Sequence, residues 1–237
     1  MRSWLYSILT FSLLLVSLPL SVGAVDVGTP PGSAPTLPPS VVPASLYSVT
    51  LSQSAAIGGT PVTGTVKLTG WAPSGGTVQL SSISNPAVAS VPASVQVSGQ
   101  SPLVSFQVTT LPVAAQTIVT ISASYAGVTK KATLTVLPAS LSSVTLPPKV
   151  YGGYSAHGVV SLTGPATSGG IVVNLQGGIP GIAAVPASVT VAAGATTADF
   201  TVTTNKVQIT SKVTILAFYG GVTRYASFIL AALPSFP

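Results

Sequence analysis

Residues 119–136, with the sequence VTISASYAGVTKKATLTV, give the clearest indication of how this chain folds. Apolar and polar residues alternate on both sides of Ala126-Gly127, and a period of two is typical of strands with one buried face. The Ala-Gly pair supplies a turn, so the stretch predicts a β-hairpin. The same pattern returns 94 residues later as VTILAFYGGVTRYASFIL, residues 213–230. We therefore expect two copies of one β-structured unit.

The repetition extends well beyond this hairpin. Leu68-Thr-Gly70 returns as Leu162-Thr-Gly164, and Val91-Pro-Ala-Ser-Val95 returns as Val185-Pro-Ala-Ser-Val189. Further short strands are expected in the first copy at 65–69, 77–82, 95–97 and 103–109, with Gly, Pro, Asn and Ser between them. About seven short strands with regular turn signals indicate an immunoglobulin-like β-sandwich. No helical periodicity follows the N-terminal segment, which argues against a parallel α/β fold.

The N-terminal residues predict export. Arg2 precedes an uncharged, mostly apolar stretch, and Pro19 and small residues follow it, so residues 1–24 are expected to form a signal peptide cleaved after Ala24. The alternative is an uncleaved anchor, since residues 4–25 reach the roughly 20 residues that a membrane span needs. Residues 25–44 hold six prolines and predict a linker.

The expected organisation is therefore all-β, with two tandem immunoglobulin-like β-sandwich domains after a signal peptide and a Pro-rich linker. The domains are expected at 45–138 and 139–233, where Leu137-Pro138 and Leu233-Pro234 mark the ends of the two repeats. We expect the protein to be secreted or held at the cell surface, with no membrane segment after signal cleavage.

Charge is scarce in this chain. Charged residues make up 4% of it, against about 25% in an ordinary soluble domain. The few cations are not clustered, so nucleic-acid binding is not expected. No cysteine is present, which excludes disulfides and thiol chemistry. One histidine and two aspartates are too few for a metal site, and no cofactor motif is found.

The residues that could support catalysis are His157, Asp199 and Asp26. The chain contains the residue types that a Ser-His-Asp triad needs, and residues 153–157 superficially resemble a nucleophile elbow. That segment lacks the second glycine, and the elbow needs a strand-to-helix turn that a sandwich would not provide. We therefore expect no enzymatic activity and interpret His157 as a surface residue at the start of a strand.

Aromatic residues divide into two groups. Core positions are expected for Phe106, Phe200, Tyr125 and Tyr219, which match between the repeats. Exposure is expected for Trp71, Tyr47, Tyr151, Tyr154 and Tyr225. Trp71 follows the Leu-Thr-Gly motif where the second repeat has Pro165, so we expect it in a loop. It is the candidate ligand contact of a carbohydrate-binding module.

The repeats resemble the bacterial immunoglobulin-like tandem repeats of secreted and surface proteins. The residues that carry this resemblance are 141–146 (LSSVTL), 158–164 (GVVSLTG), 185–191 (VPASVTV), 193–202 (AGATTADFTV) and 219–224 (YGGVTR). Repeat 1 departs from the pattern at residues 97–103. The resemblance implies a spacer, an adhesive module or a structural unit, and it brings no functional-residue motif.

The outer strand of repeat 1 suggests self-association. Sandwiches normally protect edge strands with charge, bulges or proline, and residues 47–52 carry no charge. Tyr47, Val49 and Leu51 are therefore the candidate edge-strand contacts, whereas Pro147-Pro148 protects the second repeat.

Lys130 and Arg224, at matching places, are expected to be solvated cations near a hairpin edge. Strand addition from the N-terminal segment of another copy would be heterologous and could build a filament. We expect a structural or adhesive protein with a homo-oligomeric or surface-polymer partner. A carbohydrate-binding module and a passive spacer remain as alternatives.

Overall fold

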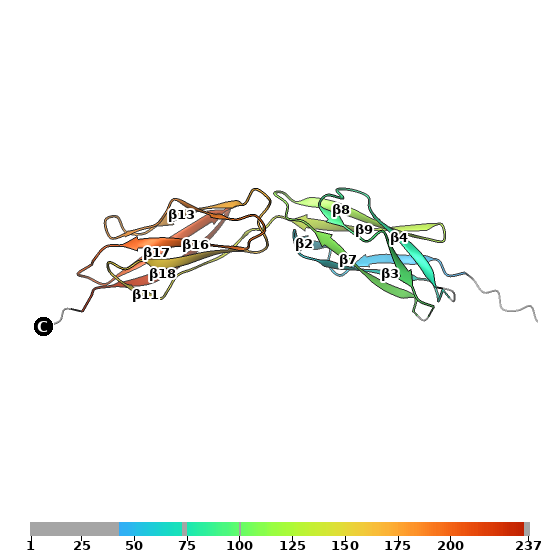
Figure 1. The fold of residues 1–237 in the computed structure, drawn as a ribbon, viewed down its shortest axis with the longest axis horizontal. Coiled ribbons are helices and arrows are strands. Elements are labelled where there is room, and N and C mark those ends of the chain that lie inside the picture. The colour runs from blue at the N-terminus through green and yellow to red at the C-terminus, as the bar shows by residue number, and fades with distance from the viewer. Residues whose placement is uncertain (1–42, 73–74, 100, 235–237) are drawn as a thin grey trace, which may run out of the picture. The chain divides into compact units, whose positions relative to one another are not determined.

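A computed structural model of the chain describes residues 43–72, 75–99 and 101–234. The expected signal peptide (1–24) and nearly all of the linker (25–44) lie outside the described residues. Within those residues, every regular element is a β-strand (Figure 1). None of them belongs to a helix of the length and apolarity that crossing a membrane would need.

Repeat 1 folds into two sheets. One has the order β1-β3-β7-β5 and the other the order β2-β9-β8-β4-β6. The strands are β1 (Leu46–Leu51), β2 (Ala55–Ile57), β3 (Val62–Leu68), β4 (Gly76–Ser82), β5 (Ala89–Ser90), β6 (Ser94–Val97), β7 (Leu103–Thr110), β8 (Thr117–Tyr125) and β9 (Val128–Leu137).

Repeat 2 builds the same two sheets with the same strand order. Its four-stranded sheet is β10-β12-β16-β14, and its five-stranded sheet is β11-β18-β17-β13-β15. The strands are β10 (Leu141–Thr145), β11 (Lys149–Tyr151), β12 (Ala156–Leu162), β13 (Ile171–Gly177), β14 (Ala183–Ala184), β15 (Ser188–Val191), β16 (Thr197–Thr204), β17 (Ser211–Tyr219) and β18 (Val222–Ala231).

The first strand of each repeat is divided between the two sheets. β1 pairs antiparallel with β3, and β2 then crosses to pair in parallel with β9. β10 and β11 divide in the same way between β12 and β18. In each repeat, a four-stranded sheet and a five-stranded sheet connected in this order form an immunoglobulin-like β-sandwich. This confirms the predicted all-β fold class.

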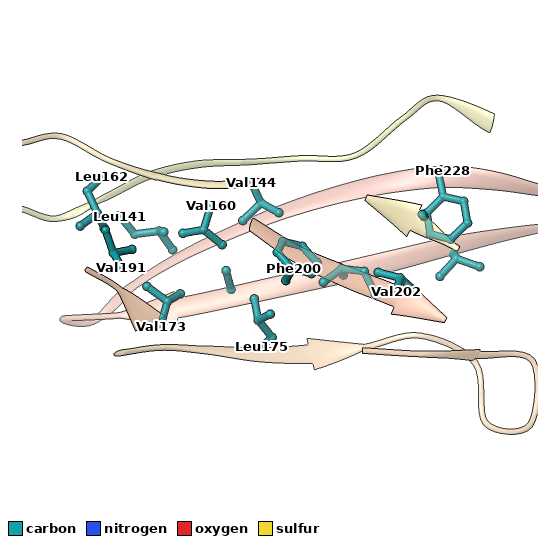
Figure 2. Close-up of a cluster of buried hydrophobic side chains, with 14 of the residues drawn as sticks. Leu141, Val144, Val160, Leu162, Val173, Leu175, Val191, Phe200, Val202 and Phe228 are labelled. Atoms are coloured by element: carbon teal, nitrogen blue, oxygen red, sulfur yellow. The ribbon is translucent and has the colours of Figure 1, made fainter. Parts of the chain in front are cut away.

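Alternating side chains from both sheets fill each core. In repeat 2, Figure 2 shows Phe200 and Val202 of β16 and Val173 and Leu175 of β13 pointing into one apolar cluster, to which Phe228 of β18 belongs. Repeat 1 has an equivalent cluster that includes Phe106 and Val119. Tyr125 and Tyr219 are half-buried and pack against these clusters, as predicted. With no disulfide available, burial of these side chains is the main stabilising contribution in each sandwich.

The Leu-Thr-Gly motif has the same structural role in both repeats. Leu68 and Leu162 are buried. The threonine that follows each leucine accepts a hydrogen bond from the backbone at the start of the repeat. The Ser45 N–H donates to Thr69 Oγ1 at 3.0 Å, and the Ser140 N–H donates to Thr163 Oγ1 at 2.9 Å. The motif therefore fixes where the first strand enters the sheet.

Candidate functional site

Strand β1 lies at one edge of its sheet and pairs only with β3. The register shifts between Leu46 and Ser48, so Tyr47 forms a β-bulge. Bulges are one of the means by which sheets interrupt edge pairing. The edge of repeat 1 therefore has a protection that the absence of charge did not reveal, and because β10 has the same register shift between Leu141 and Ser143, the bulge does not distinguish the two repeats.

The three predicted contact residues of β1 do not share one environment. The side chain of Tyr47 is exposed, Leu51 is half-buried and Val49 belongs to the core. The bulge at Tyr47 interrupts the alternation along the strand, so Val49 points inward although Tyr47 points outward, and the side chain of Val49 is not available to a partner. Any strand addition here must use the backbone groups of β1, with Tyr47 as the exposed side chain.

Beside this edge, the first strand of each repeat contacts the last strand of the other sheet, and we call this junction of the two sheets the seam. β1 lies next to β9, and β10 lies next to β18. In repeat 2, Arg224 of β18 donates from Nε to the backbone carbonyl of Ser142 in β10 at 2.8 Å. Ser142 sits at the register shift of β10, so the bond occupies an acceptor of the bulge. Arg224 therefore links the two sheets through this hydrogen bond, which we call the arginine lock, while its side chain stays exposed to solvent as predicted.

The same position in repeat 1 holds Lys130, and the residue that matches Ser142 is Tyr47. Within the described residues, Lys130 makes no hydrogen bond across the seam. The cation that approaches Tyr47 is Lys67, whose Nζ lies 5.2 Å from the centre of the ring. The two seams therefore differ in one respect: an arginine lock closes one, whereas the other lacks it.

Trp71 lies in the loop after β3, and its side chain is 65% exposed. Tyr47, Tyr151, Tyr154 and Tyr225 are also exposed, as predicted. A hollow of about 440 Å³ in repeat 1 is lined by residues around β2 and by Leu137, and Trp71 is not among them. Trp71 is thus an exposed aromatic ring that does not line that hollow.

His157 and Asp199 come together on the four-stranded sheet of repeat 2. His157 Nε2 lies 3.6 Å from Asp199 Oδ1, on neighbouring strands β12 and β16. Both side chains are largely open to solvent, at 66% and 70% exposure. Water screens such a pair, and the position on a strand is not a strand-to-helix turn. In the part of the chain that the structure describes, no three histidine or carboxylate groups gather to hold a metal ion.

Sequence reasoning placed Lys130 and Arg224 at matching sites but missed what distinguishes them. The sequence did contain a signal of this difference, since repeat 1 has lysine where repeat 2 has arginine. Only a guanidinium offers hydrogen-bond donors in a fixed planar geometry. It also missed β2 and β11, which give the short parallel pairings at the start of each repeat.

Comparison with known proteins adds structural similarity only. No family model and no curated protein sequence matches the chain. The D00-D0 domain of Intimin is 14% identical with a TM-score of 0.33, and the match covers 78% of this chain and 98% of that one. A crystal structure of titin domains is 11% identical with a TM-score of 0.42, and the match covers 80% of this chain and 65% of that one. With these scores, the fold assignment rests on the strand order and register.

Proposed function

We propose that the chain is a non-enzymatic, exported structural or adhesive protein of the cell surface or extracellular matrix. The apolar, charge-poor sandwiches fit a structural or adhesive module, and the N-terminal sequence supports export. Copies of the protein associate by adding a strand to the edge of β1 in repeat 1. Such contacts are heterologous, because they join different surfaces of the two copies. A series of these contacts that does not close into a ring produces a filament.

The observation that carries this proposal is the difference between the two seams. Strand addition requires backbone donors and acceptors that no neighbour occupies. Arg224 occupies one such acceptor in β10, whereas Lys130 leaves the matching position in β1 without that bond. Repeat 1 is therefore the acceptor, and repeat 2 is closed against the same reaction.

The arginine lock can be exchanged between the repeats without any change in net charge. Lys130→Arg places a guanidinium where it can donate to the Tyr47 carbonyl, and Arg224→Lys removes the lock from repeat 2. Light scattering of the chain from Val25 should show weaker association for Lys130→Arg and stronger association for Arg224→Lys. Lys131→Arg, a neighbouring exchange on the outer face of the sheet, is the matched control and should behave as the wild type.

Equal association of the wild type and Lys130→Arg would rule out the edge of β1 as the acceptor. The mass of the exported protein tests the other half of the proposal: a chain that begins at Val25 agrees with signal cleavage after Ala24, and a retained N-terminus contradicts it.

A carbohydrate-binding module is the second candidate function, favoured by the exposure of Trp71 in its loop. Indole rings provide flat apolar surfaces on which sugar rings can stack. Binding on a glycan array that Trp71→Ala abolishes would support this function. Binding that survives the substitution, or no binding at all, would reject it.

A further inference from the structure

The outer face of the five-stranded sheet, turned away from the core, differs between the repeats. In repeat 2 this face carries Val172 of β13, Leu216 and Phe218 of β17, and Tyr225 and Ile229 of β18, which we call the apolar face. These residues alternate with core residues such as Ile215 and Phe228 along the same strands. They lie on the solvent side of the sheet, where polar residues are usual.

Strand register identifies the counterparts of the apolar face in repeat 1. Asn174 lies across from Phe218, just as Gln79 lies across from Ser124. On this register, Val172, Leu216, Phe218, Tyr225 and Ile229 correspond in order to Thr77, Ser122, Ser124, Lys131 and Thr135. Each polar residue of repeat 1 is replaced by an apolar or aromatic residue in repeat 2. The same fold therefore tolerates either set.

Four residues of the apolar face form one continuous patch. Tyr225 lies directly across from Leu216. Phe218 is a diagonal neighbour of both Val172 and Tyr225, a separation that aromatic side chains bridge. Tyr225 is 74% exposed and Val172 is 54% exposed. Contiguous exposed apolar surface of this kind marks sites of interaction in soluble proteins.

We propose that the apolar face is the contact surface for a second copy of the chain, packed sheet against sheet. At strand spacings of about 4.8 Å and a rise of about 3.4 Å per residue, the five strands present roughly 550 Å² of sheet. If the whole sheets of two copies pack together, with β11 and β15 beside the apolar face, they bury about 1,100 Å², which just exceeds the roughly 1,000 Å² expected of a specific interface. The expected dimer is therefore weak and depends on concentration.

The charges of this face are compatible with a second copy. The strands β13, β17 and β18 contain no aspartate or glutamate, and β11 adds Lys149 across from Ile229, so ion pairs do not contribute to a contact between two copies. Lys212 lies on this face at the start of β17, and Phe218 lies near the end of the strand. An antiparallel two-fold arrangement brings the Lys212 ammonium of each copy to the Phe218 ring of the other, a favourable cation–π contact.

The proposal is independent of strand addition at β1, because it uses a different surface of the other repeat. The effect of salt on binding distinguishes a second copy of the chain from an anionic partner. The chain has a formal net charge of +6, so salt should weaken repulsion between copies and strengthen the dimer. Salt would instead weaken the binding of an anionic polymer.

The absence of cysteine allows a crosslinking test on the chain from Val25. Thr214→Cys places one thiol near the expected two-fold axis, and Thr120→Cys places one at the matching position of repeat 1. With a short bismaleimide, Thr214→Cys should give a covalent two-copy species whose yield rises with concentration and salt. Thr120→Cys should remain a single copy.

Replacing Leu216, Phe218 and Tyr225 by their repeat 1 counterparts tests the face itself. Leu216→Ser, Phe218→Ser and Tyr225→Lys, added together to Thr214→Cys, should lower the dimer affinity by about tenfold or more. Leu103→Ser with Ile118→Ser, which removes exposed apolar residues from repeat 1, is the control and should change nothing. If the triple variant does not fold, Tyr225→Lys alone replaces it, because that side chain is largely exposed.

Two results would overturn the proposal. One is the absence of crosslinking for Thr214→Cys at the highest attainable concentration and salt. The other is crosslinking that is equal for Thr120→Cys or is unaffected by the face substitutions. Because Lys130→Arg leaves this face intact, it should not alter the crosslink, and failure of strand addition is therefore distinguishable from failure of this dimer.

Discussion

The ring of Phe200 lies directly over Gly158, the residue that faces it across strands β12 and β16. A Cβ built on Gly158 would overlap the ring. Phe106 and Gly64 repeat this relationship across β3 and β7 in repeat 1. In each sandwich, a glycine in one strand thus makes room for the aromatic side chain that fills the core from the next strand.

Gly158→Ala should destabilise the protein through this overlap. The Phe200 ring would have to leave its position in a closely packed core, and overpacking typically costs about 1–3 kcal/mol. Denaturant unfolding should show the loss as a lower midpoint. Gly127→Ala is unsuitable as a control because its φ of 78° adds backbone strain. Gly70→Ala is suitable, since a Cβ there meets no atom within 4 Å. Equal stability of Gly158→Ala and the wild type would contradict the packing described.

Thr110→Val should cost more stability than Thr204→Val at the matching site. Thr110 Oγ1 donates to the Thr60 carbonyl at 2.7 Å and accepts from the Gly59 N–H at 3.1 Å. Thr204 makes the equivalent bonds to Tyr154 and Gly153. Thr110 is only 3% exposed and its two bonds are partly buried, so valine would leave partly buried polar groups unpaired, at a cost of about 1 kcal/mol.

Around Thr204 the bonds are open to solvent, and water can replace the hydroxyl. The measurement is the difference in free energy of unfolding between the two variants. A larger loss for Thr204→Val would contradict the role given to burial.

The sequence predicted much of this fold because its signals are local. The alternation in residues 119–136 requires only a buried and an exposed face, and the structure places a hairpin there. The burial of Phe106 and Phe200 was predicted because the two residues match between the repeats. By contrast, Ala55–Ile57 is a three-residue strand that pairs in parallel with β9 near the end of the repeat. Its conformation depends on a distant partner, so no local pattern identified it.

The candidate site was only partly predictable for the same reason. Lack of charge in residues 47–52 predicted that this edge strand is unprotected. It did not reveal the bulge at Tyr47 or the inward direction of Val49. The contact between Arg224 and Ser142 joins residues 82 positions apart across two sheets. Such contacts depend on tertiary geometry.

Each repeat is predicted to fold alone when expressed as residues 45–138 or 139–233. Each has its own apolar core made from both of its sheets. Domains of about 100 residues unfold with enthalpies of roughly 60–80 kcal/mol. Calorimetry should therefore show one cooperative transition for each fragment. A fragment without a cooperative transition would contradict the predicted domain boundary.

No enzymatic turnover is predicted for the chain from Val25. The imidazole and carboxylate of His157 and Asp199 are open to water, which weakens the electrostatic effects that catalysis exploits. A panel of ester, peptide and glycoside substrates should show hydrolysis at the rate of buffer alone, both for the wild type and for His157→Ala. Turnover that disappears in His157→Ala would contradict the assignment.

The proposed function requires that copies of this protein associate into larger assemblies. Its most direct test combines light scattering with negative-stain microscopy on the chain from Val25 and on a version that begins at Ser45, over a range of concentration and salt. We expect assemblies of more than one copy for the chain from Val25, growing with concentration, and weaker assembly for the version without the N-terminal segment. Both versions remaining monomeric under all conditions would contradict it.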